Sequence, residues 1–255
     1  MASSRNKVYV VTGANRGLGF GMVALLLQRA STTIIGTVRS QASAEALASD
    51  IKAVSTAAGS RLVTIILDFS RAPEPSVVLE RLKDAAPDID IVDVLIANAG
   101  TTSAMPNPLS TSAQALRSEF EVNTIGPLMV FQGLWPLLQK STLPKFIVIS
   151  SSLGSIGAQD SLPAGAYGPS KAAVNWLVKS IHQLMGDTGI VSVAIHPGFV
   201  KTAMGNFAAA QWGDIIAPNM TVEESVAGVI DVVDGATREN SSGKLIAYDG
   251  QEIQW

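Results

Sequence analysis

The stretch Val8-Tyr-Val-Val-Thr-Gly-Ala-Asn-Arg-Gly-Leu-Gly-Phe-Gly21 decides how we expect this chain to fold, because an apolar strand runs through glycines into a helical pattern. Gly13, Gly17 and Gly19 have no Cβ, so the backbone can turn tightly, admit a pyrophosphate and pack the helix against its strand. Amide groups at the start of the helix would then face the anion. The spacing predicts a phosphate-binding turn. The alternative is a strand-to-helix turn whose glycines are incidental.

The bulk composition narrows the possible classes of protein. The chain has 255 residues, of which 47% are hydrophobic, enough for one sizeable core in an undivided α/β domain. Its formal net charge is -3 without a run of like charge, so we expect neither a nucleic acid nor a membrane as partner. The chain has 0 cysteines, which excludes a disulfide framework and a thiolate nucleophile and makes the cytoplasm the default compartment.

Short apolar runs alternate with segments of helical period along the sequence. Seven runs are typical of strands covered on both faces: Lys7–Val11, Thr32–Val38, Arg61–Leu67, Ile91–Ala97, Lys145–Ser150, Val191–His196 and Lys244–Ala247. The helical segments are Leu18–Ala30, Ala42–Ala57, Ser76–Ala85, Thr111–Gln139, Ala164–Met185 and Thr221–Val233. The alternation predicts an α/β fold, namely one Rossmann-type doubly wound domain over residues 1–255. Its sheet would be mostly parallel and seven-stranded, with helices on both faces.

Two local features refine these boundaries. Thr111 with Gln114, and Thr221 with Glu224, have the spacing of capping boxes at the starts of helices. The segment 202–220 has weak periodicity and small residues. It is either a lid over a substrate pocket or a plain surface connection.

The residues that follow the second strand bear on the choice of dinucleotide. Folds that prefer NAD carry an acid there for the ribose 2′-hydroxyl, whereas folds that take NADP offer cations to the 2′-phosphate. Here Arg39 follows the strand and no carboxylate appears before Glu45. Arg39 and Arg16 could flank the phosphate, which favours NADPH over NADH. The alternative is that both arginines only solvate the surface.

Polar residues also end two other predicted strands. Asn98-Ala-Gly100 has small residues that leave space beside a cofactor, although Asn98 could instead close a turn. Asp68 could accept a hydrogen bond from an adenine amine or cap its own turn. The spacing leaves both pairs of alternatives open.

Tyr167 and Lys171 are four residues apart and therefore share one face of a helix. A free phenol, with a pKa near ~10, exchanges protons poorly at neutral pH, whereas a neighbouring ammonium favours the phenolate. A phenol tuned in this way can donate a proton to a carbonyl oxygen. The alternative is an exposed tyrosine and lysine on a helix surface.

Taken in order, these motifs resemble those of the short-chain dehydrogenase/reductase family over nearly the whole chain. The motifs are Thr-Gly-x-x-x-Gly-x-Gly from Thr12 to Gly19, Asn-Ala-Gly, an asparagine within the fourth helix, a serine after the fifth strand, Tyr-x-x-x-Lys, and Pro-Gly followed by a threonine. The resemblance implies an oxidoreductase in which Tyr167 is the general acid, Lys171 lowers its pKa and binds the nicotinamide ribose, and Asn123 holds a water in a proton relay.

The resemblance also implies the remaining site residues. Ser150, Ser151 and Ser152 are candidates for the serine that orients the carbonyl, and the Ser-x-x-Gly spacing measured back from Gly154 selects Ser151. Asp68 would contact adenine, and the backbone at Val200 and Thr202 would fix the carboxamide. The implied cofactor-binding residues are Gly13, Asn15, Arg16, Gly17, Leu18, Gly19, Arg39, Asp68, Asn98, Ala99, Gly100, Tyr167, Lys171, Pro197, Gly198, Val200 and Thr202.

The tail Ser242–Trp255 and the pair Ser155-Ile156 resemble a carbonyl-reductase subgroup that includes fungal ketoreductases of polyketide pathways. The resemblance implies NADPH-dependent reduction of a ketone or aldehyde on a fairly apolar, aromatic or polyketide-like substrate, and a homodimer or homotetramer. The alternatives are a non-redox step on the same fold, such as cyclisation, elimination or epimerisation, and an NADPH-binding scaffold. No metal site is expected, because neither His182 nor His196 has a second ligand at metal-binding spacing.

Overall fold

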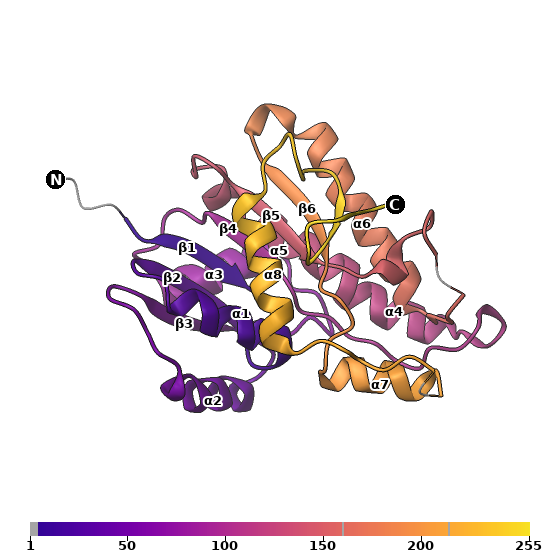
Figure 1. Cartoon of the computed structure of the whole chain (residues 1–255). Coiled ribbons are helices and arrows are strands. Elements are labelled where there is room, and N and C mark those ends of the chain that lie inside the picture. The colour runs from indigo at the N-terminus through magenta and orange to yellow at the C-terminus, as the bar shows by residue number, and fades with distance from the viewer. Residues whose placement is uncertain (1–4, 160, 214) are drawn as a thin grey trace.

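A computed structural model describes residues 5–159, 161–213 and 215–255 and contains one sheet flanked by helices (Figure 1). The strands are β1 Lys7–Val11, β2 Thr32–Val38, β3 Arg61–Ile66, β4 Val94–Ala97, β5 Lys145–Ile149, β6 Val191–His196, β7 Leu245–Ala247 and β8 Glu252–Ile253. The α-helices are α1 Gly17–Leu27, α2 Gln41–Asp50, α3 Pro75–Ala85, α4 Ala113–Phe120, α5 Gly126–Leu138, α6 Tyr167–Leu184, α7 Ala203–Gln211 and α8 Val222–Gly235.

The strand order is β3-β2-β1-β4-β5-β6-β7-β8, and the first seven strands run parallel. The order reverses between β1 and β4, whose register pairs Tyr9 with Val94 and Val11 with Ile96. In open α/β sheets, ligands bind at such a reversal, beyond the carboxyl ends of the strands. The topology therefore places the glycine turn and the end of β4 side by side at the expected binding edge.

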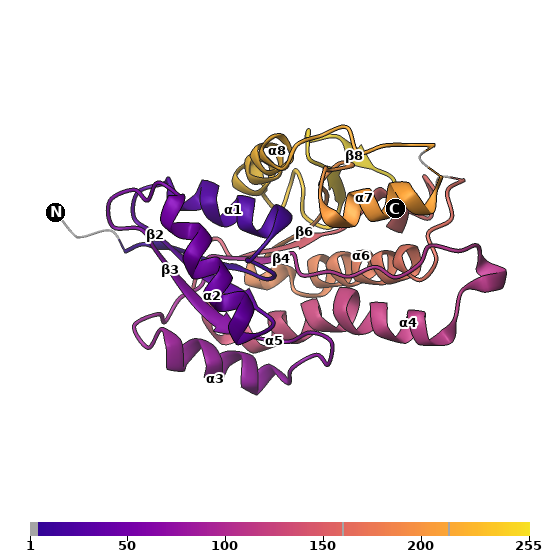
Figure 2. The same ribbon diagram turned by 90° about the horizontal axis from the view of Figure 1, so that it is seen from below.

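The sheet has a separate apolar core on each face. Figure 2 shows α1 and α8 on one side of the sheet and α3, α5 and α6 on the other. Tyr9 and Val11 belong to the core under α1 and α8, whereas Val8 and Val10 belong to the core on the opposite face. Successive side chains of one strand thus enter different cores, which explains why the strands are mostly apolar and do not alternate with polar residues.

The predicted fold class is confirmed, and three details differ. An eighth strand, β8, adds antiparallel to β7 through a two-residue pairing, so the sheet has eight strands where we expected seven. The expected helix over 111–139 is divided into α4 and α5 by the π-helical turn Glu121–Ile125. Ser112, and not Thr111, caps α4, whereas the capping box of Thr221 and Glu224 on α8 is present.

The segment 202–220 is more regular than its sequence pattern suggests. It contains α7, which Thr202 caps by accepting a hydrogen bond from the amide of Gly205. Val200 pairs with Met220 in an isolated parallel bridge, which joins the two ends of the segment. Residue 214 of the expected lid lies outside the described residues. Within the described residues, no helix is long and apolar enough to cross a membrane.

Candidate active site

The glycine turn has a backbone that only glycine tolerates at its critical positions. Gly13 has φ of 68° and Gly17 has φ of 54°, both in the left-handed region. A Cβ on Gly19 would lie 2.1 Å from the carbonyl oxygen of Gly13, so α1 packs closely against the turn. The first amides of a helix have no partner within it. The turn therefore fits the pyrophosphate of a dinucleotide, since it offers free donors and no side chain in the way.

Thr12 ties this turn to the end of β4. Its hydroxyl oxygen accepts hydrogen bonds from the amides of Asn98 and Ala99, each at 2.9 Å. The side chain of Asn98 donates back to the carbonyl oxygens of Thr12 and Gly13, at 2.8 and 3.4 Å. Asn98 therefore supports the neighbouring glycine turn, so its side chain does more than close its own turn. Ala99 and Gly100 follow it directly.

The residues expected to select the dinucleotide lie near the carboxyl edge. Arg16 is the residue before α1 and Arg39 follows β2; both side chains are exposed. Within the described residues, neither forms an ion pair, so their charges are available to a phosphate. Asp68 accepts hydrogen bonds from the amide and the hydroxyl of Ser70, both at 2.9 Å, so it does cap its own turn.

Tyr167 begins α6 and meets Ser151 at the end of β5. The Ser151 side chain is close enough to the phenol to lower its pKa. The ammonium of Lys171 lies 5.6 Å from the centre of the Tyr167 ring and donates to the carbonyl oxygen of Ile149 at 2.8 Å. Lys171 is 4% exposed, so its charge is held inside the protein beside the phenol. The fold thus brings together three of the four predicted catalytic side chains.

Burial and nearby groups change the pKa values of this group. Burial raises the pKa of the Tyr167 phenol above its ordinary value, the carboxylate of Glu119 raises it further, and the Ser151 side chain lowers it. Burial lowers the pKa of Lys171 to about 8, against the opposing effect of Glu119. Burial is thus the largest effect on the phenol pKa, and the lowering of that pKa by Lys171 stays a prediction.

The three candidate serines lie in different surroundings. The hydroxyl of Ser150 donates to Asn175 at 2.6 Å and faces the interior. Ser152 interacts through its backbone, whose amide donates to Nδ1 of His196 at 3.2 Å. Of the three, Ser151 is the one whose side chain acts on the pKa of the phenol. The geometry therefore favours the serine that the Ser-x-x-Gly spacing selects.

Asn123 lies in the π-helical turn and is completely buried. Its side chain accepts from the amide of Thr101 at 2.9 Å and donates to the Thr101 carbonyl oxygen and to Ser170, at 2.9 and 3.0 Å. These bonds fix the loop after β4 against α6. Both hydrogens of the side-chain amide are thus engaged, and its oxygen accepts one hydrogen bond.

The segment Pro197–Thr202 lines the same edge beyond β6. Gly198 has φ of 85°, and the carbonyl oxygen of Pro197 accepts from Ser225 of α8 at 2.6 Å. The amide of Thr202 donates to the carbonyl oxygen of Val200 at 2.8 Å. These bonds hold the segment in one conformation beside the carboxyl ends of β1 and β6.

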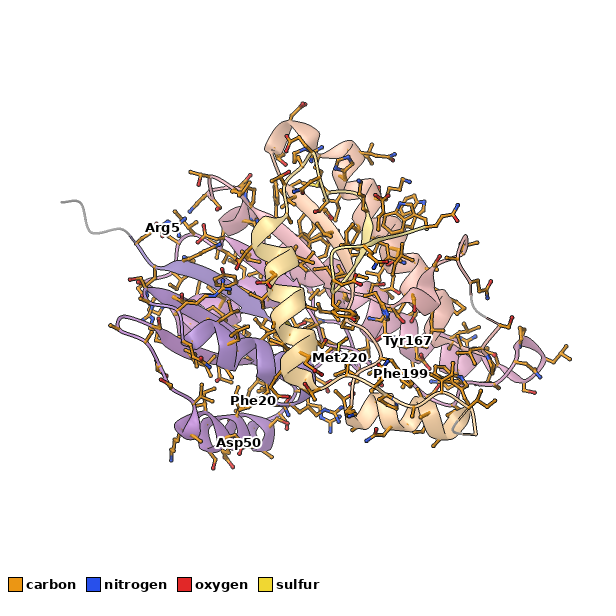
Figure 3. The ribbon with its side chains drawn as sticks, viewed as in Figure 1. Arg5, Phe20, Asp50, Tyr167, Phe199 and Met220 are labelled. Carbon is orange, nitrogen blue, oxygen red and sulfur yellow. The ribbon has the colours of Figure 1, made fainter. Side chains whose placement is uncertain are left out.

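An apolar cluster lies over Tyr167. Phe199 and Trp212 have ring centres 5.7 Å apart, and Met105 and Leu153 complete the cluster. Figure 3 places Phe199 beside Tyr167, toward α7. The indole of Trp212 donates to the carbonyl oxygen of Pro163 at 2.8 Å, which holds α7 over the phenol. This arrangement favours the lid over the plain connection.

Sequence reasoning missed two parts of this site. Phe199 precedes the segment 202–220 and Trp212 lies in it, where periodicity is weak, so only the fold could bring these two residues to Tyr167. Glu119 is 1% exposed and acts on both Tyr167 and Lys171. One signal for Glu119 was available, because it precedes Asn123 by one helical turn. Among the described residues, no group of three or more histidine, cysteine and acidic side chains could hold a metal ion.

Comparison with known proteins places these motifs in a family. Residues 7–212 match the model of short chain dehydrogenases. The chain is 35% identical to the short-chain dehydrogenase srdF of Neurospora crassa, over 100% of both chains. It is 34% identical to the norsolorinic acid ketoreductase nor1 of Dothistroma septosporum, over 99% of this chain and 94% of the other.

Comparison with solved structures gives the same relationship. The NADPH-bound carbonyl reductase from chicken fatty liver is 29% identical and superposes with a TM-score of 0.81, covering 99% of this chain and 100% of the other. Motif order, strand topology and full-length similarity agree, and the chain belongs to the short-chain dehydrogenase family.

Proposed function

We propose that this protein reduces a ketone or aldehyde to an alcohol with NADPH. The observation that carries the proposal is the position of the Tyr167 ring, 5.6 Å from the buried ammonium of Lys171 and next to Ser151, at the edge that the glycine turn opens. A phenol that keeps its proton is suited to give that proton to a carbonyl oxygen. Similarity to carbonyl reductases and ketoreductases supports the same direction of reaction.

Each side chain has a defined task in this reaction. NADPH, when bound, supplies the hydride for the carbonyl carbon. Ser151 donates a hydrogen bond that orients the carbonyl oxygen, and Tyr167 transfers its proton to that oxygen as negative charge develops there. Lys171 places a positive charge beside the phenol and stabilises the phenolate that forms. Asn123 fixes the loop after β4 so that these groups keep their positions.

The preference for NADPH rests on two cations and a missing acid. Arg39 and Arg16 are exposed at the carboxyl edge without an ion-pair partner among the described residues, and guanidinium groups bind phosphate in a bidentate manner. The same edge offers Asp68 to the adenine, in addition to the turn that it caps. The NADPH-bound carbonyl reductase is a relative that supports this choice.

The apolar cluster suggests the class of substrate. Phe199, Trp212, Met105 and Leu153 surround the phenol with aromatic and aliphatic surface, which suits a flat apolar ketone. The relatives named as norsolorinic acid ketoreductases point to polyketide-derived aryl ketones. We also expect the protein to act in the cytoplasm. A homodimer or homotetramer would cover Trp176 and Leu184 on α6, which are 68% and 81% exposed.

Consumption of NADPH with a panel of aryl and alkyl ketones tests the proposal. Tyr167→Phe should reduce kcat at least about a hundredfold, because the proton donor is lost, whereas Tyr9→Phe on β1 should retain the wild-type rate. With NADPH deuterated at the transferred position, the alcohol should carry deuterium. Product without deuterium would point to a non-redox step, and tight NADPH binding without turnover of any ketone would point to a scaffold.

A further inference from the structure

Glu119 is a buried carboxylate that the reaction described above does not use. It is 1% exposed, near the end of α4. Its Oε1 accepts hydrogen bonds from the amide and the hydroxyl of Ser103, at 2.8 and 2.5 Å. Its Oε2 is buried and has no hydrogen-bond partner among the described residues. An unpaired buried carboxylate oxygen is costly, so we looked for the charge that it faces.

The helix arrangement places Glu119 opposite the catalytic end of α6. Both α4 and α6 follow parallel strands, and their alignment is fixed where Asn123 bonds to Ser170. Glu119 lies about one helical turn before Asn123, and Tyr167 lies about one helical turn before Ser170. Ser103, which holds the carboxylate, lies three residues beyond Gly100, whose ideal Cβ would be 3.8 Å from the Lys171 ammonium. The loop after β4 thus connects the carboxylate to the catalytic group.

The ammonium of Lys171 also has hydrogen-bonding capacity that is not used. Its ammonium has three donors, and one donates to the carbonyl oxygen of Ile149. No carboxylate forms an ion pair with it within the described residues. A buried ammonium and a buried carboxylate, each with unused hydrogen-bonding capacity, therefore lie on two helical segments that the bond between Asn123 and Ser170 joins.

We propose that Glu119 is a positioning residue of the proposed reaction: a fixed negative charge, opposed to Lys171, that sets the pH range over which Tyr167 can donate its proton. The proposal rests on the proposed function and extends it by one residue. Glu119 need not touch substrate or cofactor, because a charge acts through the poorly solvated interior. Its effect on the site is electrostatic.

The charged groups around the phenol are few enough to give the direction of the effect. Lys171 faces it from α6 and Glu119 from α4, while Ser151 contributes a neutral hydroxyl from the end of β5. The cluster of Phe199 and Trp212 on the remaining side is apolar. Glu119 raises the pKa of the phenol and also that of Lys171. Removing its charge should therefore release both protons at lower pH.

The pH dependence of kcat/KM for ketone reduction tests this inference. Reduction needs the positive charge of Lys171 to stabilise the phenolate that forms, so its rate falls as pH rises through the Lys171 pKa of about 8. In Glu119→Gln the fall should occur roughly half a pH unit or more below that of the wild type, the size of effect expected of a nearby charge. Glu119→Met should move the profile in the same direction, because it also removes the charge.

Glu121→Gln is the matched control. Glu121 lies two residues further along the chain, and its carboxylate accepts from the amide of Ala72 at 2.7 Å. This variant has the same net charge as Glu119→Gln, so its pH profile should coincide with the wild type. Far-UV circular dichroism and thermal melts verify that all variants are folded.

The outcomes are distinguishable. If the wild type reduces ketones and the profiles of folded Glu119→Gln and Glu119→Met coincide with it, the role of Glu119 is refuted and the proposed function stands. If Glu121→Gln shifts the profile equally, the effect is one of net charge and the inference is also refuted. If the wild type does not consume NADPH with any ketone, the proposed function fails first.

Discussion

Replacement of Gly19 by alanine is the sharpest test of the glycine turn. The added Cβ would lie 2.1 Å from the carbonyl oxygen of Gly13 and 2.7 Å from the side-chain nitrogen Nδ2 of Asn98. An ordinary contact needs about 3.5 Å, so backbone must move by roughly 1 Å. Flexible side chains cannot relieve this overlap, because the nearest atom belongs to the main chain. The turn and the start of α1 must separate.

Overpacking of this kind destabilises a protein by about 1–3 kcal/mol, which for a chain of this size lowers the melting temperature by about 4–8 °C at the middle of that range. We expect NADPH affinity to fall at least about tenfold, since a shift of the turn misplaces several anion donors together. Thermal denaturation and isothermal titration calorimetry with NADPH measure the two effects.

Gly235→Ala provides the matched control. Gly235 ends α8, and a Cβ there would meet nothing within 4 Å. Because alanine favours a helix more than glycine, this variant should equal or exceed the wild-type stability by up to about 1 kcal/mol. If Gly19→Ala matched Gly235→Ala in both melting temperature and NADPH affinity, the close packing of α1 on the turn would not be what the site requires.

Three further perturbations test other parts of the molecule. Arg39→Ala should weaken NADPH binding at least about fivefold and leave NADH binding unchanged; equal losses for both cofactors would contradict a 2′-phosphate contact. Trp212→Phe removes the bond to Pro163, worth about 1 kcal/mol, so KM for an apolar ketone should rise about fivefold in initial-rate measurements. Lys145, whose buried ammonium donates to the carbonyl oxygens of Val233 and Asp234, has a pKa lowered to about 8, mainly by burial. Between pH 8 and the ordinary pKa of lysine, the Lys145 side chain is therefore protonated in the unfolded chain but neutral in the folded protein. The free energy of unfolding should rise with pH through that range. Urea unfolding should show the wild type gaining on Lys145→Met from pH 8 to 10, and a constant difference would refute the burial argument.

Sequence reasoning was most successful where local pattern and burial coincide. The bounds of β1, β2 and β6 are those expected, since each is a mostly buried run whose apolar side chains enter both cores. The capping box of Thr221 and Glu224 depends on residues three apart, which a sequence displays directly. Such features need no knowledge of distant partners.

The missed features depend on contacts between distant segments. β8 has only two residues, one of them charged, and is a strand because β7 lies beside it. The small residues of α7 present no strong apolar stripe, so its helix is recognisable only once packed. The π-helical turn follows from the bonds that Asn123 makes to Thr101 and Ser170, 22 and 47 residues away. Glu119 matters for the same reason.

The hydroxyl of Thr12 has a consequence for the energetics of ligand binding. By accepting from the amides of both Asn98 and Ala99, it joins two loops that belong to different strands into one rigid unit. The conformational entropy of arranging those loops is therefore spent during folding and not when a dinucleotide arrives. Because the two loops are already arranged, most of the free energy of their contacts with a dinucleotide can appear as binding affinity. The same link implies that both loops lose their order together when the hydrogen bonds of Thr12 are broken.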